Sequence, residues 1–274
     1  MYILRFCIWL MTGLAFAVSP MPAHAEASLA ATKMDIASAL NIAGRQRMLS
    51  QRMVKAYLML GQGIASNSAR AILQESINQF ESQLATLKAF QPTPMVRSAV
   101  VNLESAWTPC KALLTAAPGK TGAVALYDAN EALQKAAHNM TLAYAGNTAA
   151  PLDHLVSIAG RQRMLSQRMA KFYFYRTWEL YDSPADMELH LSRAHFTAVL
   201  IQIENSPLVS AQVKASVVRI RREWEPYQQV LFASRDPANM RKDAARVAEL
   251  SERVLTATED LVAQLVAQAQ GSPR

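Results

Sequence analysis

Cysteine, glycine and long apolar runs are all scarce in this sequence of 274 residues. One of its two cysteines, Cys7, falls in the only extended apolar run, which spans residues 6–18. The other, Cys110, cannot form an internal disulfide alone, and the sequence offers no CxxCH haem-attachment motif and no Cys/His cluster for zinc. The apolar context of Cys110, WTPCKALL, predicts a buried structural thiol rather than a reactive one.

The first 25 residues have the features of a secretory signal peptide. Arg5 precedes the apolar run, a helix-breaking SPMP segment follows it, and Ala23-His24-Ala25 forms a small-x-small cleavage site. The apolar run is shorter than the ~20 residues that a membrane-spanning helix needs. We therefore expect cleavage after Ala25 and a periplasmic protein of residues 26–274, with an uncleaved membrane anchor as the alternative.

Runs of basic residues and the common catalytic motifs are also missing. The net charge of +7 comes from 28 basic and 21 acidic residues that are dispersed along the chain. Dispersed charge argues against a polybasic membrane tail, and export argues against nucleic acid, which leaves an anionic ligand. No Ser/His/Asp order, glycine-rich phosphate loop or HExxH motif is present, and His190 and His195 are wrongly spaced for a metal pair. We expect no enzyme, no metal and no cofactor.

A duplicated segment is the main positive feature of the sequence. The twelve residues IAGRQRMLSQRM occur at 42–53 and again at 158–169. Phe80 and Phe196 occupy equivalent positions, and WTP at 107–109 corresponds to WEP at 224–226. The chain is therefore expected to consist of two homologous halves, residues 26–147 and 148–274.

Helix-forming residues dominate both halves, and turn residues divide each half into four segments. The predicted helices span residues 28–60, 66–90, 95–116, 121–145, 151–181, 185–204, 208–233 and 238–269. Short loops between helices of this length favour up-and-down topology. The predicted fold class is all-α, with two tandem antiparallel four-helix bundles.

The duplicated segment predicts a helix with two apolar faces. One face is ordinary bundle core, made of Ile42, Leu49, Met53, Ala56 and Leu60. The second face has an arginine at its centre and consists of Leu40, Ala43, Arg47, Gln51, Val54 and Leu58. Its equivalents in the second copy are Val156, Ala159, Arg163, Gln167, Ala170 and Phe174. A second apolar face needs a second partner, and the other copy is the obvious one.

Contact between the two copies would bring Arg47 and Arg163 together. Two guanidinium groups about 7 Å apart repel by roughly 2 kcal/mol at an effective dielectric constant near 20. A small planar oxyanion between them would remove this repulsion and accept charge-assisted hydrogen bonds. Gly44 and Gly160, one turn before each arginine, would allow close approach of the helices. The predicted ligand-binding residues are Arg47, Arg163, Gly44, Gly160, Ala43, Ala159, Gln51 and Gln167; the alternative is that the arginines pair with acids such as Glu104, Glu131 or Glu223.

The pattern N-x-A-G-x-x-R-M-x-S-x-R at 41–52 resembles the P-box of nitrate/nitrite sensor kinases of the NarX type. It is also similar to the PilJ-type N-terminal domain of type IV pili methyl-accepting chemotaxis transducers. The second copy departs from the pattern at Ser157, where asparagine is expected. The resemblance implies a periplasmic four-helix bundle whose P-box arginine contacts nitrate or nitrite at a dimer seam, a role that falls on Arg47 and Arg163.

Sensors of this kind are anchored in the membrane and continue into signalling domains, whereas no second membrane segment or kinase is recognisable here. We expect the tandem copies to replace the homodimer and to bind a small inorganic anion, with nitrate and nitrite favoured. The signal would pass to a partner such as a membrane transducer protein. The alternative is a ligand-free periplasmic adaptor that uses the duplicated helices for protein contacts. The sequence leaves the oligomeric state open.

Overall fold

The computed structural model describes residues 34–271, and every regular element in this range is an α-helix. The helices are α1 (Ile36–Gly61), α2 (Ser66–Ala89), α3 (Pro94–Thr115), α4 (Lys120–Ala145), α5 (Pro151–Thr177), α6 (Asp182–Glu204), α7 (Ala211–Leu231) and α8 (Pro237–Gly271). The predicted all-α class is confirmed. Between residues 34 and 271, none of the helices combines the length and the apolar character of a membrane span. The predicted signal peptide, residues 1–25, lies outside the described residues.

Three of the predicted helix limits differ from the structure by three or four residues: the end of the fifth helix and the starts of the sixth and the seventh. Residues 28–33 of the predicted first helix lie outside the described residues; in the described range α1 begins at Ile36, because Asp35 is extended and its carboxylate accepts a hydrogen bond from the Ser38 amide. The fifth helix ends at Thr177 because Glu179 and Tyr181 adopt left-handed backbone conformations. The seventh begins after Ser210, whose hydroxyl caps its first turn.

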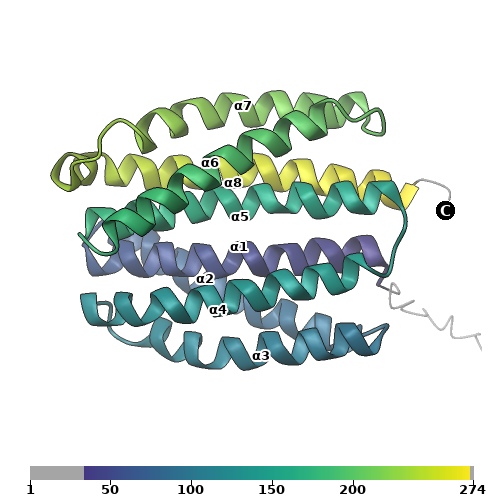
Figure 1. Cartoon of the computed structure of the whole chain (residues 1–274), viewed down its shortest axis with the longest axis horizontal. Coiled ribbons are helices and arrows are strands. Elements are labelled where there is room, and N and C mark those ends of the chain that lie inside the picture. Colours follow the sequence, from purple (N-terminus) through teal and green to yellow (C-terminus); the bar gives the residue numbers. More distant parts are fainter. Residues whose placement is uncertain (1–33, 272–274) are drawn as a thin grey trace, which may run out of the picture. The chain divides into compact units, whose positions relative to one another are not determined.

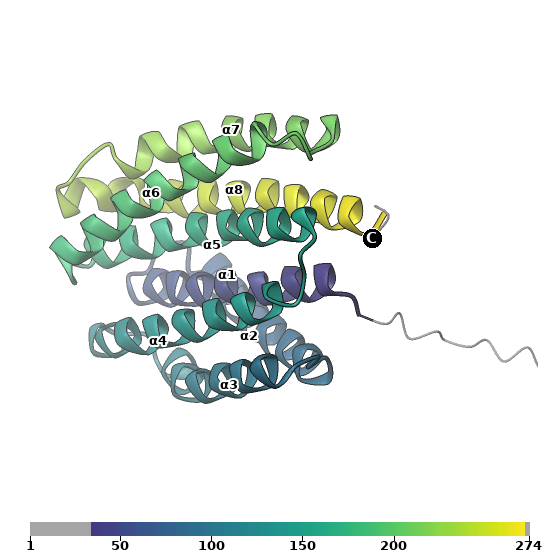
Figure 2. The same ribbon diagram turned by 45° about the vertical axis from the view of Figure 1, so that its right-hand side comes forward.

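The eight helices form two antiparallel four-helix bundles, α1–α4 and α5–α8 (Figure 1). The first helix of each bundle lies at the centre of the arrangement, and α3 and α7 lie on the outside. The two views agree that α1 and α5 run side by side in the same direction (Figure 2). No other pair of helices in the described part of the chain is in more extensive contact. The two copies of the duplicated segment therefore face each other.

Equivalent contacts recur in the two bundles. The rings of Phe80 and Trp107 are 4.3 Å apart and inclined at 31°, and those of Phe196 and Trp224 are 4.4 Å apart and inclined at 32°. A glutamine of the duplicated segment donates to the main-chain carbonyl of each phenylalanine: Gln46 to Phe80 and Gln162 to Phe196. The similarity between the halves thus extends from the sequence to the packing of each core.

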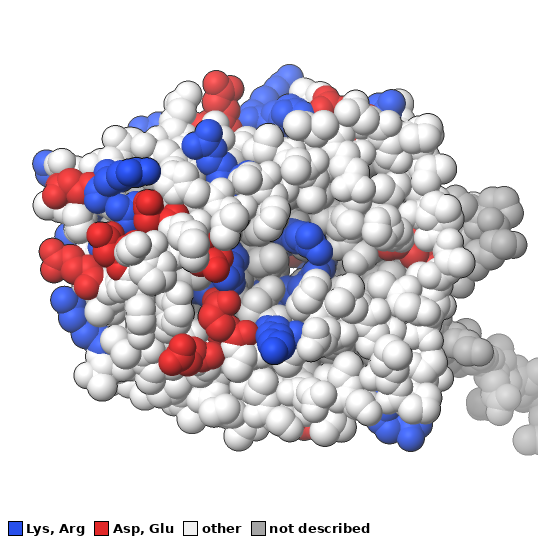
Figure 3. All heavy atoms as spheres, viewed as in Figure 1, with Lys and Arg blue, Asp and Glu red and all other residues white. Residues whose placement is uncertain are grey.

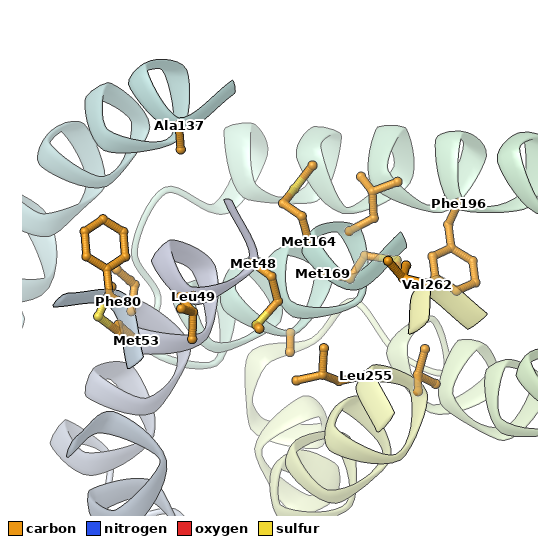
Figure 4. Close-up of a cluster of buried hydrophobic side chains, with 14 of the residues drawn as sticks. Met48, Leu49, Met53, Phe80, Ala137, Met164, Met169, Phe196, Leu255 and Val262 are labelled. Carbon is orange, nitrogen blue, oxygen red and sulfur yellow. The ribbon is translucent and has the colours of Figure 1, made fainter. Parts of the chain in front are cut away.

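The methionines of the duplicated segment are core residues. Met48, Met53, Met164 and Met169 are each at most 8% exposed. Figure 4 shows them among buried aliphatic and aromatic side chains that come from both bundles. Flexible thioethers fill irregular gaps where helices of different bundles meet, and this packing accounts for the methionines of both copies.

Two ion-pair clusters join each bundle to the central helix of the other. Glu252 of α8 accepts hydrogen bonds from Lys55 and Arg52 of α1. Reciprocally, Glu131 of α4 accepts them from Lys171 and Arg168 of α5, at 2.7 and 2.9 Å. We call these the cross-bundle clamps. Because each lysine is at most 1% exposed, its charge depends on the carboxylate from the opposite bundle.

The clamps shift the pKa values of their members. Burial raises the pKa of Glu131 and of Glu252, but the adjacent lysine and arginine outweigh burial and hold each pKa at about 2. Burial lowers the pKa of Lys171 to about 8, although Glu131 opposes this shift. A carboxylate whose pKa falls on folding stabilises the fold above its ordinary value, and this contribution disappears as the pH drops toward the folded pKa.

We predict that Glu131→Gln lowers the free energy of unfolding by about 1–3 kcal/mol at neutral pH, less than for a fully buried pair because a third of Glu131 is exposed. The difference from the unsubstituted protein should vanish as the pH falls from 4.5 toward 2. Urea unfolding at several pH values measures both effects. The control is Glu104→Gln, which removes the exposed Lys88–Glu104 pair and should cost less than about 1 kcal/mol. Equal losses in the two variants would contradict the clamp.

Candidate functional site

The backbones of α1 and α5 lie close together where the duplicated segment carries glycine. A Cβ atom on Gly44 would lie 3.9 Å from the Cα atom of Gly160, and one on Gly160 would lie 4.0 Å from the Cα atom of Gly44. A methyl group at either position would already be in van der Waals contact with the opposite backbone, so that little space is left for a larger side chain. The predicted close approach is therefore present, and each glycine faces its equivalent in the other copy.

Both candidate arginines reach this glycine contact. The Nη2 atoms of Arg163 and Arg47 lie 3.3 and 3.4 Å from the position of a Cβ atom on Gly44. The space that the absent side chains would occupy is thus bordered by two guanidinium groups. Both arginines are buried, with exposed fractions of 2% for Arg47 and 1% for Arg163. The structure therefore brings the two predicted central residues together at the contact between the bundles.

Each arginine crosses to the opposite helix and donates to its main chain. Arg47 Nη2 donates to the carbonyl oxygen of Ser157 at 3.2 Å. Arg163 Nη2 donates to the carbonyl oxygen of Asn41 at 3.1 Å, and its Nη1 donates to the Asn41 side-chain oxygen at 2.8 Å. Asn41 and Ser157 are equivalent residues of the two copies. The hydrogen bonds are reciprocal, but Arg163 has one acceptor more than Arg47.

Neither arginine has a carboxylate partner among the described residues. The three acids considered as alternatives pair elsewhere: Glu104 with Lys88, Glu131 with Arg168 and Lys171, and Glu223 with Arg253. The Nε atoms of Arg47 and Arg163 are buried and have no acceptor. Two charged donors therefore remain available at the centre of the protein.

The electrostatic cost of this arrangement appears in the pKa values of the two arginines. Burial lowers the pKa of Arg47 to about 10, and the charge of Arg161 adds to the shift. Burial lowers the pKa of Arg163 to about 9; Arg45 and Arg47 lower it further, while Glu259 opposes them. Because a guanidinium keeps its proton in proteins, these shifts mean that the fold holds two charges in an unfavourable environment. An anion between them would reduce that cost.

The other predicted ligand-binding residues are also buried, but they do not all face the arginines. Ala43 and Ala159 are completely inaccessible to solvent. The amide nitrogen of Gln51 donates to Asn130 of α4, and that of Gln167 donates to the Ser251 carbonyl of α8. Each glutamine thus bonds within its own bundle, although its Oε1 atom has no donor. Whether either glutamine contacts a ligand stays a prediction.

Other chemistry finds little support in the described part of the chain. Residues 34–271 contain no group of three or more His, Cys, Asp or Glu side chains that could hold a metal ion. Cys110 is buried, and burial raises the pKa of its thiol to about 12, so that it stays protonated. Asn41 is the residue that the sequence analysis did not identify: its position in the N-x-A-G motif was noted, but not its contact with Arg163.

A family model matches most of the chain. The family is described as PilJ, type IV pili methyl-accepting chemotaxis transducer N-term, and its model matches twice, at residues 30–137 and 140–253. The two matches agree with the two-copy organisation and with the resemblance of the duplicated segment. Comparison with curated proteins and with solved structures gave no match.

We predict that Gly44→Leu lowers the free energy of unfolding by about 1–3 kcal/mol, because a larger side chain cannot fit beside Gly160 and the guanidinium groups. Thermal or urea unfolding measures the loss. The control is Ala132→Leu on the exposed side of α4, where introducing the same leucine side chain should change the stability by less than about 0.5 kcal/mol. Equal stability of Gly44→Leu and the control would contradict the close approach of α1 and α5 at Gly44.

Proposed function

We propose that this chain, which belongs to the PilJ family of type IV pili methyl-accepting chemotaxis transducer N-terminal domains, is a periplasmic sensory module for a small oxyanion. The family consists of sensory domains, typically periplasmic and without catalytic activity, that act with signalling partners. In this proposal Arg47 and Arg163 hold the anion between α1 and α5, and nitrate and nitrite are the favoured ligands. The chain recognises them without catalysing a reaction.

One observation carries the proposal: two buried arginines meet at the contact between the bundles with no carboxylate partner among the described residues. An uncompensated buried charge normally costs several kcal/mol, and buried charges are usually paired. A fold that places two such charges side by side has the electrostatic character of a site for an anion. The unused Nε donors supply directional hydrogen bonds for it.

The ligand class follows from the donors. A guanidinium presents planar, forked N–H groups that match two oxygen atoms of a planar oxyanion better than they match a spherical halide. Nitrate and nitrite have that shape and one negative charge. Each charge-assisted hydrogen bond contributes about 1.5–3 kcal/mol, and part of this is offset by desolvation of the anion. Even a millimolar dissociation constant, about −4 kcal/mol, is consistent with such a site.

Signalling would use the contact between the two bundles. The anion would remove the repulsion between the arginines, so it would stabilise the arrangement in which α1 and α5 lie close together. A ligand shifts a conformational equilibrium by the difference in its affinity for the two states. Within one chain the tandem copies would perform the task that a homodimer performs in the resembled sensors. A partner, such as a membrane transducer, would read the change.

We predict that nitrate or nitrite at about 100 times its dissociation constant stabilises the protein by roughly 2.7 kcal/mol. Chloride at the same ionic strength should have a much smaller effect. Arg47→Gln and Arg163→Gln should each weaken binding at least tenfold in isothermal titration, because each removes a charged donor. The control is Arg246→Gln on the exposed face of α8, which changes the net charge equally and should leave affinity within about twofold.

Two outcomes would contradict the proposal. Equal affinity of the unsubstituted protein and both arginine variants would show that an anion binds elsewhere. Absence of any response to nitrate and nitrite at low salt, in a protein that captures a binding partner without ligand, would instead favour an adaptor. Since loss of a buried arginine can also alter folding, the thermal unfolding of each variant without ligand is measured first.

A further inference from the structure

A groove of about 500 Å³ opens on the face formed by α4, α5 and α6, and the buried Arg47 of α1 is one of its lining residues. Figure 3 shows this face in the orientation of Figure 1, with lysine and arginine atoms around a hollow between the paths of α4 and α5. The charged and titratable lining residues are Arg47, Glu131, Lys135, His138, Arg161, Arg168, Glu188 and His195. Because a water molecule takes about 30 Å³, the groove has room for a small oxyanion with part of its hydration shell.

The two acids of the groove are already neutralised. Glu131 pairs with Lys171 and Arg168, and Glu188 pairs with Arg168. By contrast, Arg47, Arg161 and Lys135 of the groove take part in none of the ion pairs of the described residues. The uncompensated charge of the groove is therefore positive, and Arg161 is close enough to Arg47 for its charge to lower the pKa of Arg47.

The equivalent face on the other side of the molecule, where α1 lies against α8, differs from the groove in one charged residue. Arg45 is the equivalent of Arg161, and it pairs with Glu259 of α8 at 3.0 Å. Glu259 follows the clamp residue Glu252 by seven positions, as His138 follows Glu131. A histidine thus replaces the carboxylate that would neutralise Arg161. The positions of the two charges are close enough for Arg47 and Arg161 to lower the pKa of His138, after the larger effect of its burial.

A second difference between the copies affects the same side. Arg163 has both terminal nitrogens bonded to Asn41. Arg47 donates only from Nη2, to the Ser157 carbonyl; serine replaces asparagine at this position, and its shorter side chain accepts no hydrogen bond from Arg47 among the described residues. The Nη1 atom of Arg47 makes no hydrogen bond within the described residues and, like its Nε, is available.

We infer that the oxyanion site is one-sided: the anion reaches Arg47 through the groove between α4, α5 and α6, and Arg161 forms the outer part of the site. This inference rests on the proposed function and adds the route and the unequal roles of the two copies. His138 keeps the route open because it is never negatively charged. On the opposite side Glu259 neutralises Arg45, which leaves that pair without net charge to attract an anion.

The test compares carboxylate and amide at position 138 by isothermal titration of the full chain with nitrate at low salt. His138→Glu should pair with Arg161 as Glu259 pairs with Arg45, and should weaken nitrate binding at least tenfold. His138→Gln changes the shape without adding charge and should stay within about threefold of the unsubstituted protein. The matched control is Arg45→Gln with Glu259→Gln, which removes the ion pair on the opposite side without changing net charge and should stay within about twofold.

The results distinguish the one-sided site from the proposed function itself. Loss of affinity in His138→Glu but not in the opposite-side double variant supports the one-sided site. If nitrate binds the unsubstituted protein and His138→Glu equally, the groove is not the route, although the proposed function stands. If the double variant loses affinity and His138→Glu does not, the site opens on the other side. If the unsubstituted protein binds neither nitrate nor nitrite, the proposed function fails and the one-sided site fails with it.

Discussion

The contact between α1 and α5 depends on two buried guanidinium groups that each bond to the main chain of the opposite helix. Arg47 reaches Ser157 and Arg163 reaches Asn41, across a point where Gly44 and Gly160 face each other. The glycines permit the approach, and the approach puts two like charges into a medium of low dielectric constant. Like charges in such a medium repel more strongly than in water. The proposed anion site, in both its position and its ligand class, rests on this one arrangement.

The cross-bundle clamps explain why the repulsion does not separate the bundles. Glu252 holds α1 through Lys55, and Glu131 holds α5 through Lys171, so that each bundle supplies the counter-charge for the other. Because these lysines are buried, each requires its carboxylate partner: an unpaired ammonium in the interior is costly. The attractive clamps and the repulsive arginines lie along the same pair of helices. In the proposed function, their balance would make the contact between the bundles sensitive to an anion.

Much of this arrangement was predictable from the sequence, because the duplicated residues have recognisable roles in packing. The repeated twelve residues gave the two-copy organisation, the second apolar face of the helix predicted the contact between copies, and the glycine one turn before each arginine predicted the close approach. Helix ends were less predictable: the fifth helix stops before Glu179 and Tyr181, which are left-handed, and the seventh begins after the capping residue Ser210. The cross-bundle clamps and the contrast between His138 and Glu259 were not predicted. They join residues from different bundles, and no local pattern in one sequence indicates which distant helix an acid will meet.

A crystal structure of the protein grown with nitrate and without other oxyanions tests the central claim most directly. The account predicts a planar three-lobed density feature within hydrogen-bonding distance of the Nε or Nη1 atom of Arg47, next to the contact of Gly44 with Gly160. Density for ordered water alone at both arginines, with nitrate at saturating concentration, would contradict it.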